Sequence, residues 1–400
     1  MSAGGAAIGA DPVLALNSGS SSLKFALYAG GAADETCLAE GEAEGLGLDA
    51  GRFWIRRPGS EPDVETRTFA GPDDAIRAVF EALDAFRHPR PAAVGHRFVT
   101  GGPGLVDPVR VDADVRRRLE AAVPYAPLHL PSALTALDAV GRHFPDLPQV
   151  VCFDTAFHAA LPERAARLPV PRALFDQGIR KYGFHGLSYE SIVVQLGSDL
   201  PDRLVIAHLG SGASLAAVRR GRSVDTTMGL TPAGGVVMAT RPGDVDPGLL
   251  VFLQATAGYD AARLEHLVNH ESGLLGISGL TGDMAALLAE AAQHAEAGQA
   301  VDLFVYSVQK AVAAMAAALS GLDALVFTGG IGEHAGPVRS AICAPLGFLG
   351  IELDAAANAG SASLISARTS RVTVRVLPAQ EERMIARHTR SVLVSKPPTA

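Results

Sequence analysis

Apolar and polar positions alternate in a hairpin pattern near the start of the chain. An apolar run at Leu14–Leu16 is followed by a Gly/Ser turn, after which Leu23, Phe25 and Leu27 share one face. This pattern predicts two antiparallel strands joined by a tight turn. The turn is crowded with hydroxyls and lies beside Lys24, which is more than a chain reversal needs. Consecutive N–H groups in such a turn suit anions, so we interpret it as a phosphate-binding hairpin; an ordinary Gly/Ser turn is the alternative.

The same pattern returns in the second half of the chain. Leu204–Leu209 is apolar except for His208, Gly210–Gly212 is a Ser/Gly turn, and Ala213–Val218 is apolar except for Ser214. Internal repeats are architectural signals, so we predict two similar α/β domains, each carrying one hairpin. The bounds we expect are a disordered extension at 1–10, domains at 11–154 and 155–382, and a C-terminal helix at 383–400 that packs back on the first domain.

Helical and strand-like spacing of apolar residues predicts the remaining elements. The expected helices lie at 72–86, 132–144, 249–258, 260–269, 302–319 and 381–394, and the expected strands begin at 92, 149, 324 and 372. No apolar run of about 18 residues suggests a membrane span. The first residues lack the basic and apolar regions of a secretory signal.

Composition narrows the class of protein. The 400 residues suffice for two domains, and 48% hydrophobic with 19% charged residues is typical of a folded, soluble protein. The net charge of −8 argues against nucleic-acid binding. Three widely separated cysteines indicate free thiols in a reducing cytoplasm. An acidic protein that handles phosphates must concentrate positive charge locally, which draws attention to arginines in Gly-rich surroundings.

Charged side chains lie where two predicted strands end. Arg97 precedes the turn Gly101-Gly102, and Asp154 follows the apolar run 149–153. Ligands of open α/β sheets bind beyond the carboxyl ends of strands. A surface arginine and a turn-forming aspartate are the alternatives, but the two residues together indicate a site.

Several segments between the predicted elements have residue compositions that are typical of functional loops. His185 lies between Phe184 and Gly186, although a lone histidine is more often structural. The long loops at 224–235 and 240–248 are dense in Gly, Pro and Thr. A buried strand runs into a glycine turn at 329–332, which suits a nucleotide. For the acidic residues at 381 and 382, stabilisation by the helix dipole is the alternative to a role in the site.

These motifs, in this order, resemble the acetate kinase (acetokinase) family, part of the acetate and sugar kinase, heat-shock ATPase and actin superfamily. The resemblance covers about residues 13 to 389 and rests on Asn17–Lys24, Gly95-His96-Arg97, Phe153–His158, Tyr182–Gly186 and the run Ser223–Pro247. It implies an α/β fold with two ribonuclease-H-like (actin-like ATPase) domains flanking a nucleotide cleft. It also implies reversible phosphoryl transfer from ATP to acetate, giving acetyl phosphate and ADP by direct in-line transfer.

The resemblance further implies residue roles. Catalytic residues would be Arg97, Asp154, His185 and Arg241, and Asn17 and Glu381 would position Mg²⁺, with Mn²⁺ as an alternative. Substrate-binding residues would be Arg97, Val99, Leu128, His129, Phe184 and Pro232, and the phosphate loop would use Ser20 and Ser22. Nucleotide contacts would come from Lys24, His208, Leu209, Gly210, Ser211, Gly212, Asp283, Met284, Ala285, Gly330, Ile331, Gly332, Glu333 and His334. The expected partners are acetate, ATP and a second copy of the chain, in the cytoplasm, with no nucleic acid and no membrane.

The chain departs from the family pattern at five positions. Leu130 and Thr100, near the acyl pocket, stand where Asn and His are usual, so acetate and propionate both remain candidate substrates. Ser211, His334 and Ala285 stand where Asn, Asn and Arg are usual, which leaves the nucleotide preference open. A propionate or butyrate kinase of the same fold is one alternative function. A non-catalytic actin-like nucleotide-binding module is the other.

Overall fold

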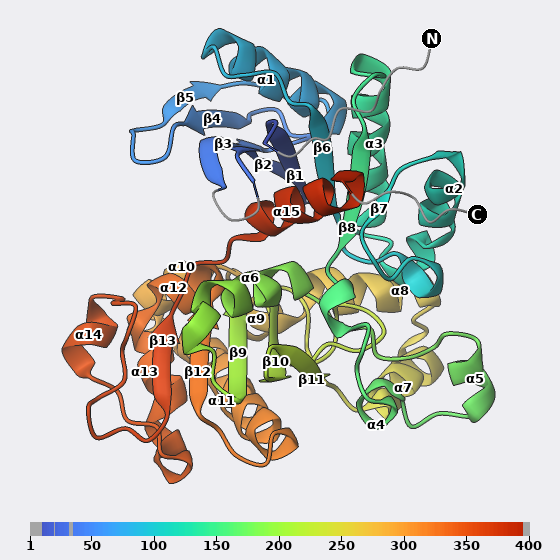
Figure 1. The fold of residues 1–400 in the computed structure, drawn as a ribbon. Helices are drawn as coiled ribbons and strands as arrows, with labels where there is room; N and C mark the ends of the chain where they lie inside the picture. The colour runs from blue at the N-terminus through green and yellow to red at the C-terminus, as the bar shows by residue number, and fades with distance from the viewer. Residues whose placement is uncertain (1–9, 20, 32–34, 395–400) are drawn as a thin grey trace. The chain divides into compact units, whose positions relative to one another are not determined.

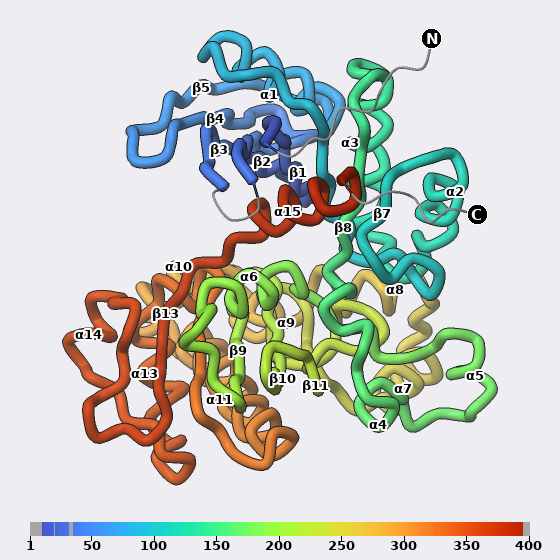
Figure 2. The backbone as a smooth tube through the Cα atoms, in the orientation of Figure 1, coloured from blue at the N-terminus to red at the C-terminus, as the bar shows by residue number. Residues whose placement is uncertain are grey.

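The structure, a computed structural model, describes residues 10–19, 21–31 and 35–394. The chain divides into two compact units: unit 1 comprises Met1–Ala156 and Gln380–Ala400, and unit 2 comprises Phe157–Ala379. Figures 1 and 2 trace the chain through each unit. The extension predicted at residues 1–10 lies, except for Ala10, outside the described residues.

Unit 1 is built on one mixed sheet. Its strands are β1 (Val13–Ser18), β2 (Ser22–Ala29), β3 (Thr36–Glu44), β4 (Arg52–Arg56), β5 (Asp63–Thr66), β6 (Ala93–Phe98), β7 (Val109–Arg110) and β8 (Gln149–Phe153). Within the described residues they form an eight-stranded sheet in the order β5-β4-β3-β2-β1-β6-β8-β7. Strands β1 to β5 form an antiparallel meander, whereas β1, β6 and β8 are parallel.

Helices cover both faces of this sheet. The helices of unit 1 are α1 (Pro72–Ala85), α2 (Ala113–Ala121), α3 (Leu130–His143) and α15 (Glu381–Val394). Helices α1 and α3 share a core with Leu14, Leu16 and Val94, whereas Ala386 of α15 packs on Val13 and Ala93. Because successive strand residues point to opposite faces, α15 lies on the face opposite α1 and α3. Figures 1 and 2 show α15, in red, returning to the blue strands from which the chain began.

The close packing of α15 on the sheet depends on a glycine in β6. A Cβ atom at Gly95 would overlap Thr389 Oγ1 and Ile385 Cγ2 of α15, so only glycine lets the helix pack this closely. Gly95, Arg97 and Asn17 lie on the same face as Val13 and Ala93, by the alternation of β1 and β6. The sheet therefore presents Asn17 and Arg97 on the face that α15 covers.

Unit 2 repeats the arrangement with a smaller sheet. Its strands are β9 (Arg203–Leu209), β10 (Ala213–Arg219), β11 (Arg222–Thr226), β12 (Ala324–Thr328) and β13 (Thr373–Val376). In unit 2, all of whose residues are described, these form a five-stranded sheet in the order β11-β10-β9-β12-β13. In both units, the first hairpin strand pairs antiparallel with its hairpin partner and parallel with a later strand. The predicted α/β class is confirmed.

Unit 2 has many short helices, and two of its longer helices cover the two faces of its sheet. The helices of this unit are α4 (Glu163–Ala166), α5 (Arg172–Asp176), α6 (Gly186–Leu196), α7 (Pro247–Ala257), α8 (Ala261–His266), α9 (Gly273–Ser278), α10 (Met284–Glu290), α11 (Ala295–Ala318), α12 (Gly329–His334), α13 (Gly336–Cys343) and α14 (Ala355–Ala359). Tyr189 and Ile192 of α6 share a core with Leu204 and Ile206 of β9. Figure 1 shows α6 in front of this sheet and α11 behind it.

Helix α11 corrects one sequence expectation. It begins at Ala295 rather than near Asp302, because the preceding residues continue the helix. Among the described residues it is the one helix that is long and apolar enough, by length and composition alone, to cross a membrane. It packs against α9, α10, α13 and the sheet, and buries Phe304, Val308 and Val312. These contacts make it a core helix of unit 2.

The glycine turn predicted after β12 is also different: it is the start of α12. Gly329 has a φ of 77°, and its N–H donates to Glu333 Oε1 at 2.9 Å. A Cβ at Gly329 would lie 2.8 Å from the carbonyl oxygen of Leu209. The glycine thus allows the end of β12 to turn into a helix beside the end of β9.

Candidate active site

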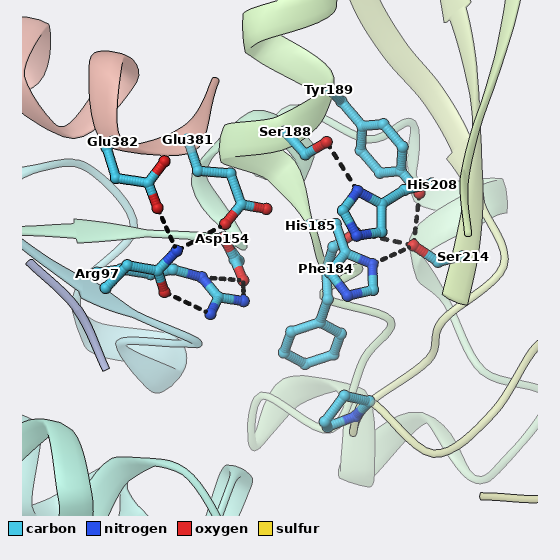
Figure 3. A network of polar contacts seen from close by, with 12 residues as sticks. Arg97, Asp154, Phe184, His185, Ser188, Tyr189, His208, Ser214, Glu381 and Glu382 are labelled. Carbon is cyan, nitrogen blue, oxygen red and sulfur yellow. Dashed lines mark hydrogen bonds and ion pairs between the residues drawn. The ribbon is translucent and has the colours of Figure 1, made fainter. Parts of the chain in front are cut away.

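The first group of polar residues lies in unit 1, at the ends of β1, β6 and β8. Arg97 donates from Nε and from NH2 to Asp154 Oδ2, at 3.0 and 2.5 Å, and from NH1 to Asn17 Oδ1 at 3.0 Å. The Asp154 side chain is fully buried, and that of Arg97 is 17% exposed. Figure 3 shows Arg97 and Asp154 within this network. The two charged residues predicted at strand ends are therefore joined by a buried ion pair.

Helix α15 adds two carboxylates to the same group. Asn17 Nδ2 donates to Glu381 Oε2 at 2.9 Å and to Glu382 Oε1 at 3.0 Å. Burial and the neighbouring Glu381 raise the pKa of Glu382. The sequence interpretation for both glutamates, stabilisation by the helix dipole, leaves out these contacts.

One cation of this group faces three carboxyl groups within unit 1. Burial opposes the charged form of Arg97, but Asp154, Glu381 and Glu382 outweigh it, so the pKa of Arg97 is raised. Arg97 therefore stays a cation throughout the physiological range. Because Asp154 engages its Nε edge, the guanidinium is held in one orientation.

The oxygen atoms of this group suit a hard cation. Two carboxylates and an amide oxygen are the ligand types that Mg²⁺ prefers. Within the described residues no cluster of three or more His, Cys, Asp or Glu side chains could hold a metal ion. Mg²⁺ usually takes one or two carboxylates and completes its shell with water and phosphates, so a sparse donor set fits it.

The first hairpin turn lies beside Asn17. Lys24 is exposed and pairs with Asn17 in the β1–β2 register. The turn is closed by Gly19, whose N–H donates to the Ser22 carbonyl at 2.8 Å and whose carbonyl accepts from Ser132 Oγ at 3.0 Å. Ser20, predicted for the phosphate loop, lies outside the described residues.

The second group lies in unit 2, on the face of the sheet that α6 covers. His208 of β9 and Ser214 of β10 are direct cross-strand partners. The ring of His185, which precedes α6, stacks on that of His208 with a centroid separation of 4.3 Å and an interplanar angle of 16°. His185 Nδ1 lies 2.7 Å from Ser214 Oγ, and His208 Nδ1 lies 2.8 Å from Ser188 Oγ. Figure 3 shows this paired arrangement of histidines and serines.

Arg241 meets this group at the second hairpin turn. A Cβ at Gly212 would lie 2.8 Å from Arg241 NH2 and 3.2 Å from His185 Nε2, so both nitrogens approach the same glycine. Arg241 NH1 donates to the Pro232 carbonyl at 2.5 Å. Burial lowers the pKa of Arg241 to about 10. No acidic side chain of the described residues pairs with it, in contrast to Arg97.

A cavity of about 510 Å³ opens beside the same turn. Eight residues predicted to contact the nucleotide line it: Gly210, Ser211, Asp283, Met284, Ala285, Gly330, Ile331 and His334. Its volume lies in the range of small-molecule sites. It is bounded by α10, which contributes Met284, Ala285 and Leu288, and by α12, which contributes Gly330, Ile331 and His334. Asp283 also caps α10 by accepting from the Ala286 N–H at 2.7 Å.

Other residues that were predicted to contact the nucleotide instead hold together the elements around this cavity. Glu333 uses Oε1 to accept from the N–H groups of Gly329 and Ala379, at 2.9 and 3.1 Å. Leu209 is fully buried at the end of β9, and Gly332 is buried within α12. His208, Leu209, Gly212, Gly332 and Glu333 do not line the cavity, and Lys24 belongs to unit 1.

The predicted acyl-pocket residues belong to both units. Val99 is 8% exposed just after β6, and Leu128 and His129 are half-buried before α3, with His129 at its N-terminal cap. In unit 2, Phe184 is 1% exposed and Pro232 is half-buried. Pro232 also supplies the carbonyl that holds Arg241.

The structure adds residues that sequence reasoning missed. They are Glu382 in unit 1, the side chains Ser188, Tyr189 and Ser214 beside the two histidines, and the cavity-lining residues Gly282, Leu288, Ala335 and Pro337. Only one signal pointed to any of them: Ser214 closes the repeated Ser/Gly hairpin that the sequence displays.

Comparison with known sequences agrees with this geometry. The model of the acetokinase family matches residues 12–387. An acetate kinase of Rhodopseudomonas palustris is 43% identical over 392 residues, covering 94% of this chain and 97% of that protein. An acetate kinase of Deinococcus deserti is 45% identical over 397 residues, covering 96% of this chain and 98% of that protein.

Solved structures give the same answer. A propionate kinase from Francisella tularensis aligns with a TM-score of 0.89 at 35% identity, covering 96% of this chain and 100% of that one. Porphyromonas gingivalis acetate kinase aligns with a TM-score of 0.84 at 36% identity, with the same coverage. With nearly its whole length matched in sequence and in fold, the chain belongs to the acetokinase family.

Proposed function

We propose that this kinase transfers the γ-phosphoryl group of ATP to acetate, reversibly and directly, giving acetyl phosphate and ADP. The observation that carries the proposal is Arg241, a desolvated cation without an acidic partner among the described residues, beside a glycine turn and two histidines. A buried cation of this kind is costly unless an anion binds it. Phosphate is the anion that such a turn accommodates.

The chemistry requires positioning more than proton transfer. A carboxylate is already ionised at neutral pH, so the acceptor needs no general base. The barrier arises from repulsion between the acceptor anion and the phosphate charge, which cationic groups relieve. We assign Arg241, His185 and Arg97 to this stabilisation. Asp154 orients Arg97 through their ion pair and abstracts no proton.

Mg²⁺ completes the proposed set, with Mn²⁺ as an alternative. Asn17 and Glu381 would hold it, and the adjacent Glu382 carboxylate supplies a further anionic oxygen. When bound, the metal would neutralise part of the phosphate charge. The support is the crowding of two carboxylates on one amide nitrogen, an arrangement of like charges that a cation relieves.

We propose that the cavity beside Gly210 takes the nucleoside of ATP. Ala285, Leu288, Ile331 and Pro337 offer it an apolar surface, and Asp283, Ser211 and His334 offer polar contacts. Gly212 and His208, beside the cavity, would face the phosphates. Lys24 and the hydroxyl-rich turn that includes Ser22 are proposed to contact the same phosphates.

The acyl group is the less constrained part of the substrate. We propose that Val99, Leu128, His129, Phe184 and Pro232 contact it. One methylene changes specificity by only about 1–3 kcal/mol, so propionate and butyrate are the nearest alternatives to acetate. The solved relatives include both an acetate kinase and a propionate kinase.

Trapping of the acyl phosphate with hydroxylamine tests the function. The enzyme, ATP and Mg²⁺ should give hydroxamate with acetate, and kcat/KM should be highest for acetate among acetate, propionate and butyrate. A higher kcat/KM for propionate or butyrate reassigns the acceptor. No hydroxamate from any of the three would leave only the alternative of a non-catalytic actin-like nucleotide-binding module.

We also propose that the enzyme is a cytoplasmic homodimer. Helix α7 buries none of its residues within the chain, and Leu249, Val251 and Phe252 are 42%, 66% and 61% exposed. An apolar helix of this kind is typical of a surface covered by another protein, here a second copy of the chain. Sedimentation of wild-type enzyme should give a dimer, and the Phe252→Asp variant should give monomers.

The cysteines support the proposed compartment. Cys37, Cys152 and Cys343, which form no disulfide, fit a reducing compartment.

A further inference from the structure

A buried carboxylate in unit 1 contacts three arginines of α15. Glu35 directly precedes β3, and its side chain is fully buried. Its Oε2 atom accepts from Arg387 Nε at 2.7 Å, and its Oε1 atom accepts from Arg390 NH1 at 3.0 Å. Arg383 Nε adds an ion pair at 3.5 Å from Oε2. We call these four residues the Glu35 cluster. Because loss of one partner from a buried ion pair is strongly unfavourable, the cluster fixes α15 to the rest of unit 1.

The spacing of the three arginines explains why they converge. They occupy positions i, i+4 and i+7 of the helix, so they lie along one stripe of its surface. The side chain of Arg390 is 4% exposed and also donates from NH2 to the carbonyl oxygens of Asp11 and Tyr28, at 3.0 and 2.8 Å. These bonds connect the third turn of α15 to β2 and to the residues before β1. The helix is therefore held along one side and not at a single point.

The arginine stripe and Glu381 lie on different sides of α15. Successive residues of a helix are about 100° apart around its axis. Ala386 packs on the sheet, and Ile385 and Thr389 closely approach Gly95, so these three residues mark the face that meets the sheet. By this geometry the arginine stripe lies about 100° to one side of that face, and Glu381 lies about 100° to the other.

A rotation of α15 about its axis would therefore alter the contacts on both sides. Asn17 Nδ2 donates to Glu381 Oε2 at 2.9 Å, and a hydrogen bond weakens steeply when its atoms are misaligned. A rotation that carries Glu381 away from Asn17 also displaces the arginines from Glu35. Because the buried ion pairs resist that displacement, they also keep Glu381 beside Asn17.

We propose that Glu35 is a positioning residue of the metal site. Through its arginines it sets the rotation of α15, and in this way it holds Glu381 where that carboxylate can bind Mg²⁺. The role in metal binding rests on the proposed function. The control of α15 by Glu35 does not, because it follows from contacts within unit 1.

Metal binding tests the proposal. Glu35→Gln keeps the shape of the side chain and removes its charge. In the presence of ATP, this variant should bind Mn²⁺ about tenfold more weakly than wild type by electron paramagnetic resonance, as loss of an outer-shell contact predicts. The Mg²⁺ concentration for half-maximal rate should rise by a similar factor, with little change in the KM for acetate. Unchanged Mn²⁺ binding overturns the proposal.

A double-mutant cycle tests whether Glu35 acts through Glu381. Each single change, Glu35→Gln or Glu381→Gln, should weaken Mn²⁺ binding. Adding Glu35→Gln to Glu381→Gln should have little further effect, because the position of a ligand that is already lost no longer matters. Two effects that simply multiply would show that Glu35 acts independently of Glu381, and would overturn the proposal.

The sign of a second variant separates positioning from a direct effect of charge. Arg387→Gln removes the shorter of the two hydrogen bonds to Glu35 from a side chain that is 22% exposed. A direct effect of charge predicts tighter Mn²⁺ binding in this variant, because a cation is lost. Positioning predicts weaker binding, by about threefold or more. Tighter or unchanged binding overturns the proposal, even where Glu35→Gln does not fold.

A matched control and a metal-free measurement complete the test. Asp138→Asn breaks the ion pair with Arg116 elsewhere in unit 1 and should leave Mn²⁺ binding unchanged. In metal-free enzyme, amide hydrogen exchange in the first two turns of α15 should be faster in Glu35→Gln than in wild type, and that of α3 should be unchanged. Equal exchange in α15 overturns the positioning role. Absence of acyl-phosphate formation in wild-type enzyme would refute the proposed function, whereas Mn²⁺ binding and exchange would still decide this inference.

Discussion

Arg97 donates from NH1 to Oδ1 of Asn17 across 3.0 Å, and through this bond the ends of β6 and β1 share one network with α15. Asn17 turns its oxygen to a cation and its nitrogen to two carboxylates. The amide of Asn17 thus links Arg97 to Glu381. Substitution of any one of these three residues should therefore change the hydrogen bonds and orientation of the other two side chains.

Arg97→Ala should reduce kcat at least a hundredfold while the protein stays folded. Loss of one donor to a developing charge costs about 2.7–4 kcal/mol. Steady-state kinetics and circular dichroism check the two parts of this expectation. Arg116→Ala is the matched control, because Arg116 forms a similar two-nitrogen pair with Asp138 elsewhere in unit 1. Near-normal turnover in Arg97→Ala would remove this residue from the proposed site.

Arg241→Lys should create a new pH dependence. Burial already lowers the pKa of Arg241 to about 10, yet the arginine stays charged at neutral pH. The same burial lowers the pKa of a lysine, whose ordinary value is lower. The charged form of the lysine is therefore lost as pH rises, and the activity of the variant relative to wild type should fall between about pH 7 and 9. A constant ratio over this range would contradict the burial argument.

Glu381→Gln should raise the Mg²⁺ concentration needed for half-maximal rate by about tenfold or more, since a ligand carboxylate is lost. Mn²⁺ binding followed by electron paramagnetic resonance in the presence of ATP gives an independent measure. Glu382→Gln provides the comparison within the same helix turn. If Glu381→Gln shows wild-type metal dependence by both measures, the proposed metal role is wrong.

Ala285→Trp should raise the KM for ATP, with little change in the KM for acetate, because the new ring fills the cavity of about 510 Å³. Ala291→Trp, beyond the end of α10, does not line the cavity and serves as the control. Equal effects on both KM values would indicate a general distortion.

Gly95→Ala should destabilise the protein by about 1–3 kcal/mol, because the added methyl overlaps Thr389 and Ile385 of α15. Gly141→Ala is the opposite control: a Cβ there meets only Gln149 Nε2 at 3.5 Å, and the change should stabilise α3 by about 0.5–1 kcal/mol. Urea denaturation measures both. If Gly95→Ala leaves the free energy of unfolding unchanged, α15 does not pack closely enough on β6 to exclude a methyl group.

The regular elements were predictable because burial imposes a period on the sequence. The alternation at Leu23, Phe25 and Leu27 gave β2, and the helix spacing gave 381–394 for α15, as found, whereas the start at 383 expected for the C-terminal helix was two residues late. Bounds shifted where local chemistry intervenes. Helix α3 starts at Leu130 rather than Ser132, because Pro131 is favourable in a first turn.

The site was only partly predictable. Arg97 and Asp154 could be paired from the rule about strand ends, but the link between Asn17 and Glu381 joins opposite ends of the chain, and only family resemblance indicated it. Tyr189 looked like an ordinary core tyrosine, and only the repeated hairpin drew attention to Ser214. Their relation to His185 depends on the β9–β10 register and on the position of α6, which no local pattern encodes.

Helix α15 has a consequence for the synthesis of the protein. Glu381 lies near the C-terminus, yet it belongs to a network whose other members, Asn17, Arg97 and Asp154, are translated much earlier. While the ribosome is still making unit 2, Arg97 and Asp154 can pair, but the acidic end of the network is missing. If Glu381 holds the metal as proposed, the nascent chain is expected to lack its complete metal site until residue 381 has been translated and α15 has packed on unit 1.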